Sequence, residues 1–109
     1  MKLINASEED LTIALSAVRE WDDDVRMAAG ALPAPNPQWL HFEMENIKVR
    51  AGAIGRVRIW ASIPKQTRYI GRRFAFVAAA DAVAGGRRTR RYFVYYAVLE
   101  GQEDATRAR

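Results

Sequence analysis

Two apolar runs separated by a pair of glycines constrain this chain more than any other feature. Arg72-Arg73 precede the first run, Gly85-Gly86 end it, and Arg87-Arg88-Thr89-Arg90-Arg91 open the second run. Taken as antiparallel strands, the two runs predict a hairpin with its turn at the glycines. This pairing gathers four arginines at the tip of the hairpin and leaves Arg72-Arg73 at its far end.

The two apolar runs differ in how clearly they predict strands. Residues 77–84 are rich in alanine and end at two glycines, a pattern that is also typical of a short helix. Phe74 and Phe76 precede them at strand spacing, so we favour a strand. The run Tyr92–Leu99 has no polar side, and such strands are covered on both faces. We expect a helix on one face and a second copy of the protein on the other, as a homodimer.

The length and composition of the chain fit one small globular domain. With 109 residues, half of them apolar, we predict a single domain over residues 1–100 and a disordered tail over residues 101–109. No apolar stretch approaches the roughly 18–20 residues that cross a bilayer, so no membrane contact is expected. Cysteine is absent, and the N-terminus lacks the apolar core of a signal peptide. A cytoplasmic location fits best.

Residues 8–29 are predicted to form one long amphipathic helix. Ser7 is a plausible N-cap, and Gly30 supplies a stop. Apolar side chains recur at helical spacing at Leu11, Ala14, Leu15, Val18, Trp21, Val25 and Ala28. Asp22-Asp23-Asp24 conflict with this helix because aspartate is a poor helix former in the negative half of a helix. A break at these aspartates therefore stays open.

Strands are predicted for the middle of the chain. Pro33, Pro35 and Pro37 indicate a stiff, extended connection. After it, apolar residues alternate with polar ones, and their parity shifts between residues 44 and 47. This shift predicts a bulge near Glu45-Asn46. A second alternating run, over residues 56–63, predicts a strand with a basic outer face.

These elements predict an α+β fold, with one long N-terminal helix packed on a four-stranded antiparallel sheet. A helix followed by four strands resembles the cystatin layout, although no cystatin motif is present. A shared layout alone implies no function.

Charge is distributed unevenly along the chain. Residues 1–46 hold three basic and nine acidic side chains, a balance of −6. Residues 47–109 hold fourteen basic and four acidic side chains, a balance of +10. The two parts could neutralise each other within the fold, or a basic face could meet a polyanion or an acidic protein.

Arginines form the candidate binding site. The residues that we assign to it are Arg87, Arg88, Arg90 and Arg91 at the hairpin tip, with Arg56 and Arg58 on the basic strand face. Arginine suits planar, bidentate contacts with phosphate or carboxylate. Aromatic residues nearby, such as Tyr92, are also what single-stranded nucleic acid requires for stacking, although core packing explains most of these rings.

Catalytic and metal-binding patterns are weak in this sequence. His41 is the only histidine, and Glu43 would share its face of a strand and orient its imidazole. No serine lies in a nucleophile motif. The three consecutive aspartates point apart on a helix and cannot close around one ion. We predict neither a metal nor a cofactor.

The sequence therefore favours a small non-enzymatic binding protein that acts through protein–protein contacts, as an accessory or inhibitory partner of a larger assembly. The first alternative is a nucleic-acid-binding module that uses the arginine-rich hairpin. The second alternative is an enzyme or a small-ligand pocket between helix and sheet, using His41, Trp60 and tyrosine residues.

Overall fold

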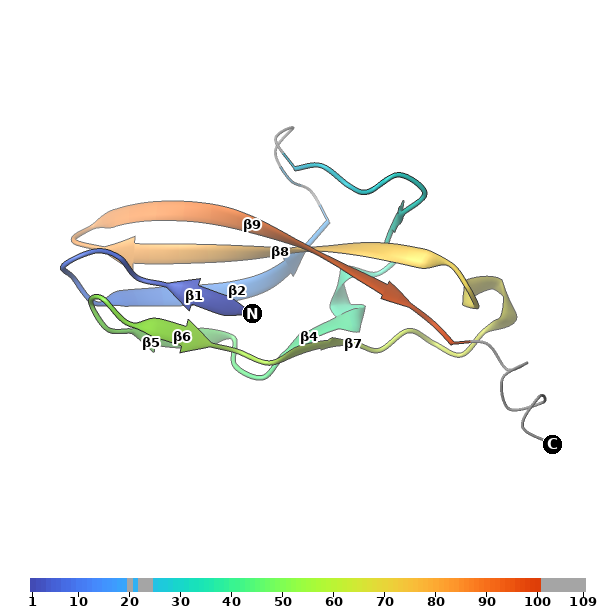
Figure 1. The fold of residues 1–109 in the computed structure, drawn as a ribbon, viewed down its shortest axis with the longest axis horizontal. Helices are drawn as coiled ribbons and strands as arrows, with labels where there is room; N and C mark the ends of the chain where they lie inside the picture. The colour runs from blue at the N-terminus through green and yellow to red at the C-terminus, as the bar shows by residue number, and fades with distance from the viewer. Residues whose placement is uncertain (20, 22–24, 101–109) are drawn as a thin grey trace.

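The computed structural model describes residues 1–19, 21 and 25–100, and strands dominate this part of the chain (Figure 1). The strands are β1 (Lys2–Ile4), β2 (Leu11–Val18), β3 (Leu32–Pro33), β4 (Leu40–Phe42), β5 (Asn46–Val49), β6 (Ile54–Arg56), β7 (Ile59–Ala61), β8 (Arg73–Ala84) and β9 (Arg87–Val98). Two single-turn 3₁₀ helices, η1 (Pro37–Trp39) and η2 (Thr67–Tyr69), are the only helices in the described ranges. The tail predicted for residues 101–109 and Asp22-Asp23-Asp24 lie outside the described residues.

The predicted hairpin is confirmed. β8 and β9 pair antiparallel along their whole length, and Ala84 faces Arg87 across the turn. Gly85 and Gly86 have φ angles of +54° and +77°. A two-residue type I′ turn needs positive φ at both central positions, which glycine adopts without a steric cost. Residues 77–84 are therefore a strand, and the helix alternative for them is wrong.

The long N-terminal helix predicted for residues 8–29 is wrong, and with it the α+β class and the cystatin-like layout. Residues 11–18 form β2, in which the residues directed inward are Leu11, Ile13, Leu15 and Ala17. Alanine is compatible with helical spacing and with strand alternation. Ala14 therefore completed the apolar stripe of the predicted helix, although it lies on the exposed side of β2. The predicted N-cap, Ser7, instead lies in the loop between β1 and β2, where its hydroxyl donates to Asn5 Oδ1 at 2.6 Å.

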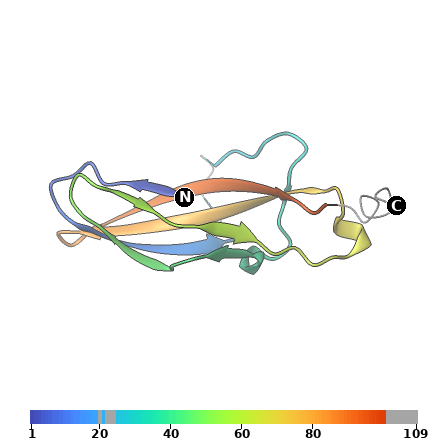
Figure 2. The ribbon, with the colours of Figure 1, turned by 60° about the horizontal axis from the view of Figure 1, so that its bottom comes forward.

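One sheet organises the described structure, in place of the predicted four-stranded sheet. β9 lies along one edge of β8, while β2 and the short β3 share the other edge, and β5 follows β2. Two short ribbons, β1 with β6 and β4 with β7, pack against one face of this main sheet (Figure 2). We call that face the inner face and the opposite one the outer face.

The core lies between the main sheet and the two ribbons. Towards the turn of the hairpin, Leu3 and Val57 of the second layer pack with Ile13 and Leu15 of β2. Towards the other end, the inner face of β8 contributes Phe74 and Phe76. Between Phe76 and the turn, every inner-facing residue of β8 is an alanine: Ala78, Ala80, Ala82 and Ala84. The core is therefore bulky at one end of β8 and shallow at the other.

The parity shift between residues 44 and 47 separates two strands rather than marking a bulge in one strand. β4 pairs with β7 in the second layer, whereas β5 pairs with β2 in the main sheet. The chain thus passes from one layer to the other over residues 43–45. Opposite parities then direct Leu40 and Val49, both buried, into the two core clusters between the layers.

The outer face of the hairpin is covered in part by the chain itself. The Ala28 amide donates to the Tyr96 hydroxyl at 2.7 Å, so the segment before β3 lies against this face. Val83, Tyr96 and Val98 still expose 40%, 37% and 49% of their surface. Association of two copies through this face stays a prediction.

Replacing Leu15 with alanine tests the position of β2. Leu15 exposes only 4% of its surface, and its truncation should lower the free energy of unfolding by about 2–5 kcal/mol. Ser16→Ala, on the exposed side of the same strand, is the control and should change stability by under about 0.5 kcal/mol. Urea unfolding measures both. Equal effects of the two substitutions would contradict the alternation that defines β2.

Candidate functional site

The four arginines of the hairpin tip lie at one end of the molecule, and Arg72-Arg73 lie at the other, as predicted. Arg73 faces Val98 at the end of the ladder, and its guanidinium lies 4.3 Å from the centre of the Tyr96 ring. Figures 1 and 2 show the hairpin tip beside the β1–β2 loop and the β5–β6 turn. The tip is thus one of three turns that gather at this end.

The register of the hairpin divides the four arginines between two faces. Residues that face each other across an antiparallel pair lie on the same side of the sheet. Arg88 faces Val83 and Arg90 faces Asp81, on the outer face. Arg87 and Arg91 face alanines and lie on the inner face. All four side chains are exposed, but they do not converge on one point.

Arg90 is already paired within the hairpin. Its Nε and one terminal nitrogen donate to the two carboxylate oxygens of Asp81, at 2.6 Å and 3.0 Å. These hydrogen bonds lower the pKa of Asp81, to which the nearby charges of Arg90 and Arg88 also contribute, and raise the pKa of Arg90. Within the described residues, no carboxylate lies within ion-pair distance of the other three tip arginines.

The acidic loop between β1 and β2 lies beside the tip. The Glu9 Oε2 atom is 3.3 Å from the position that a Cβ of Gly85 would occupy. Asp10 pairs with Lys48 of β5 at 4.0 Å rather than with a tip arginine. Asn5, which is 1% exposed, fixes this loop by donating to the carbonyls of Glu9 and Val49. Among the described residues, Asp10–Lys48 is therefore the one ion pair that joins the acidic half of the chain to the basic half.

A groove separates β9 from β1, which we call the β1–β9 groove. It encloses about 470 Å³, and the side chains that make it apolar are Leu3, Leu11, Ile13, Ala80, Ala82 and Phe93. Lys2, Thr89 and Arg91 add polar groups. The alanines of β8 create this space because their side chains do not fill the gap between the layers. A second cavity of about 580 Å³, lined by Glu8, Glu9 and Arg87, adjoins the hairpin tip.

The backbone edges along the groove are unpaired. In the described part of the chain β9 pairs only with β8, and β1 only with β6. Because Ala84 and Arg87 flank a two-residue turn, the odd residues of β9 bond to β8 and the even ones face away. On β1, Met1 and Asn5 bond toward β6, so the peptide groups of Lys2 and Ile4 face the groove.

Arg56 and Arg58 are not brought to the hairpin tip. Arg56 ends β6 in the second layer, where it faces Lys2, and Arg58 follows two residues later. Both line a cavity of about 380 Å³ with Lys2 and Glu43. Lys2 also lines the β1–β9 groove. It therefore lies between Arg56 and Arg58 on one side and Arg91 of the hairpin tip on the other. β1 is too short to show an alternating pattern, so Lys2 could not be recognised as a site residue from the sequence.

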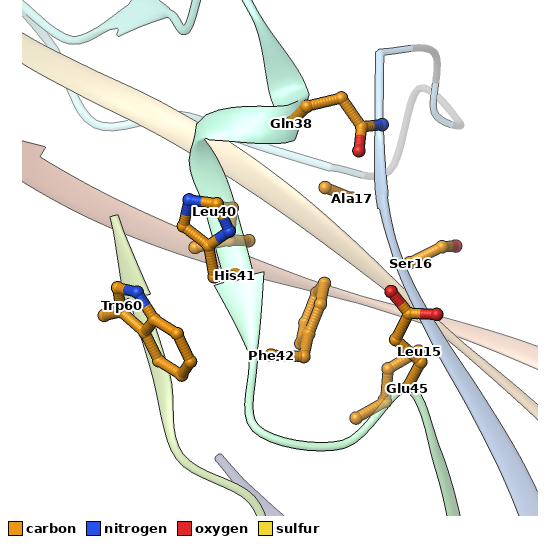
Figure 3. A pocket seen from close by; sticks show the side chains of 9 residues that line it. All are labelled: Leu15, Ser16, Ala17, Gln38, Leu40, His41, Phe42, Glu45 and Trp60. Carbon is orange, nitrogen blue, oxygen red and sulfur yellow. The ribbon is translucent and has the colours of Figure 1, made fainter. Parts of the chain in front are cut away.

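His41 and Trp60 line a cavity, but it is not the predicted pocket between a long helix and the sheet. That helix is absent from the described residues, and only Gln38 of the short η1 contributes from a helix. β4 and β7 place these two rings opposite each other, and the rings stack with their centres 5.6 Å apart. A cavity of about 350 Å³ lies between β4 and the end of β2. Figure 3 shows the side chain of Gln38 extending toward β2 and the side chain of Glu45 lying beside β2. Glu43, the predicted partner of His41, instead accepts a hydrogen bond from the Arg58 amide at 3.3 Å.

Comparison with protein-family models, curated proteins and solved structures found no match. Among the described residues, no group of three or more histidine and acidic side chains could hold a metal ion. In the same residues, no helix has both the length and the apolar character that crossing a membrane requires.

Replacing Asp81 with asparagine should flatten the acid limb of the stability profile. Because the pKa of Asp81 is lowered from its ordinary 3.8, the unfolded chain binds this proton more readily. The stabilisation is present above about pH 4 and is lost as the pH falls through the folded-state value. Urea midpoints should therefore fall more in the wild type than in Asp81→Asn between about pH 5 and pH 2, by a modest amount because the pair is exposed. Parallel profiles would show that this ion pair contributes nothing.

Proposed function

We propose that this chain is a small non-enzymatic binding protein that acts through protein–protein contacts, as an accessory or inhibitory partner of a larger assembly. The observation that carries the proposal is the outward edge of β9, whose peptide groups pair with no other strand in the described part of the chain and lie beside exposed arginines. Exposed strand edges recruit other chains because their N–H and C=O groups remain free to bond. A cytoplasmic site of action is part of this proposal.

The division of the arginines supports a protein partner over a nucleic acid. The phosphate groups of a nucleic-acid strand bind best where several cationic side chains line one continuous groove. Here Arg87 and Arg91 lie on one face of β9, Arg88 lies on the other, and Arg90 is held by Asp81. A protein edge with carboxylates on alternate residues fits this arrangement better.

Affinity capture from a lysate of the native host tests the function. We expect the wild type to enrich one or a few proteins after nuclease treatment, and Arg88→Glu combined with Arg91→Glu to lose them. The control carries Lys65→Glu and Arg72→Glu, which make the same charge change away from the hairpin tip and should retain the partners. Quantitative mass spectrometry measures the enrichment.

Two results would contradict the proposal. Capture that disappears after nuclease treatment would favour the nucleic-acid alternative. Equal loss in the tip variant and in the control would show that overall charge, rather than the hairpin, holds the partner.

A further inference from the structure

We propose that the β1–β9 groove is a strand-binding site, which takes an extended, acidic segment of a partner protein between the edges of β1 and β9. This inference rests on the proposed function and specifies the partner by its conformation and charge. The occupant would add one strand to the main sheet and close the side of the molecule on which the two layers do not meet.

The first argument is the hydrogen-bonding capacity of the two edges. The register of the hairpin directs the peptide groups of Arg88, Arg90 and Tyr92 away from β8. Opposite them, the peptide groups of Lys2 and Ile4 face away from β6. No backbone hydrogen bond joins β1 to β9 in the described part of the chain. An extended segment between them would satisfy both edges at once.

The second argument is the space beneath the edges. A strand in the groove would point alternate side chains inward, over Ala80 and Ala82. The volume of about 470 Å³ accommodates branched apolar side chains there. Phe93 and Ile13 complete apolar walls for them. Inward residues of the occupant are therefore apolar.

The third argument is charge. The other alternate side chains of the occupant would point outward, between Arg88 of β9 and Lys2 of β1, both of which are exposed. Arg91 lines the groove itself. Carboxylates on the outward positions would be neutralised by these cations, whereas lysine or arginine would be repelled. The occupant therefore alternates apolar and acidic residues.

The direct test uses a fluorescent peptide of about six residues that alternates valine and glutamate, a length that spans Arg88–Tyr92 at about 3.3 Å per residue. We expect saturable binding to the full chain, measured by fluorescence anisotropy. Methylation of alternate backbone nitrogens should weaken binding at least about tenfold, because it removes edge hydrogen bonds without changing charge. A peptide with lysine in place of glutamate should not bind.

Two variants locate the peptide in the groove. Ala82→Leu fills space that the inward valine needs, and Val83→Phe adds comparable bulk on the exposed outer face of β8 as the control. We expect the first substitution to weaken binding about tenfold or more and the second to leave it unchanged. Urea unfolding of both variants confirms that they are folded.

The outcomes separate this proposal from the function on which it rests. Equal binding of the methylated and unmethylated peptides would show attraction by charge alone and would overturn strand addition. Absence of peptide binding, together with hairpin-dependent capture from the lysate, would overturn strand addition and leave the protein-contact function standing. Failure of both experiments would overturn both proposals.

Discussion

Backbone hydrogen bonding along β8 holds the main sheet together, and the second layer packs on the inner face of that sheet. β8 is twelve residues long, and it pairs with β9 along one edge and with β2 and β3 along the other. A strand paired on both edges lies in the interior of a sheet, and the size of its inward side chains decides how well the space beneath the second layer is filled. Where Phe74 and Phe76 give way to alanines, the layers are no longer filled, and the β1–β9 groove opens. The groove is thus a consequence of side-chain size along one strand.

The arginines of β9 have two physical effects on the same edge. Exposed strand edges pair with one another and aggregate, and charged side chains are a common protection against this. Two β9 edges that met through their tips would bring Arg88 and Arg91 of each copy close together, and their repulsion opposes that contact. A strand that carries carboxylates meets no such repulsion. The same residues that discourage self-pairing would therefore select an acidic partner.

The sequence predicted the hairpin because its signals are local: two glycines between apolar runs fix the turn, and the turn fixes the register. The same register implies that Asp81 faces Arg90, a pair that sequence reasoning could have found. It could not identify β2, because Ala14 fits a helical stripe as well as a strand and only the partners β5 and β8 decide between them. The edge at Lys2 was missed because a three-residue strand has no period.

The central claim is that the outward edge of β9 is free, and amide hydrogen exchange in the uncomplexed full chain, followed by NMR, tests it most directly. Amides that bond to β8, at Thr89, Arg91 and Phe93, should exchange slowly. Those at Arg88, Arg90 and Tyr92 should exchange much faster under the same conditions. Uniform protection along β9 would contradict the account, because it would mean that the edge is already occupied.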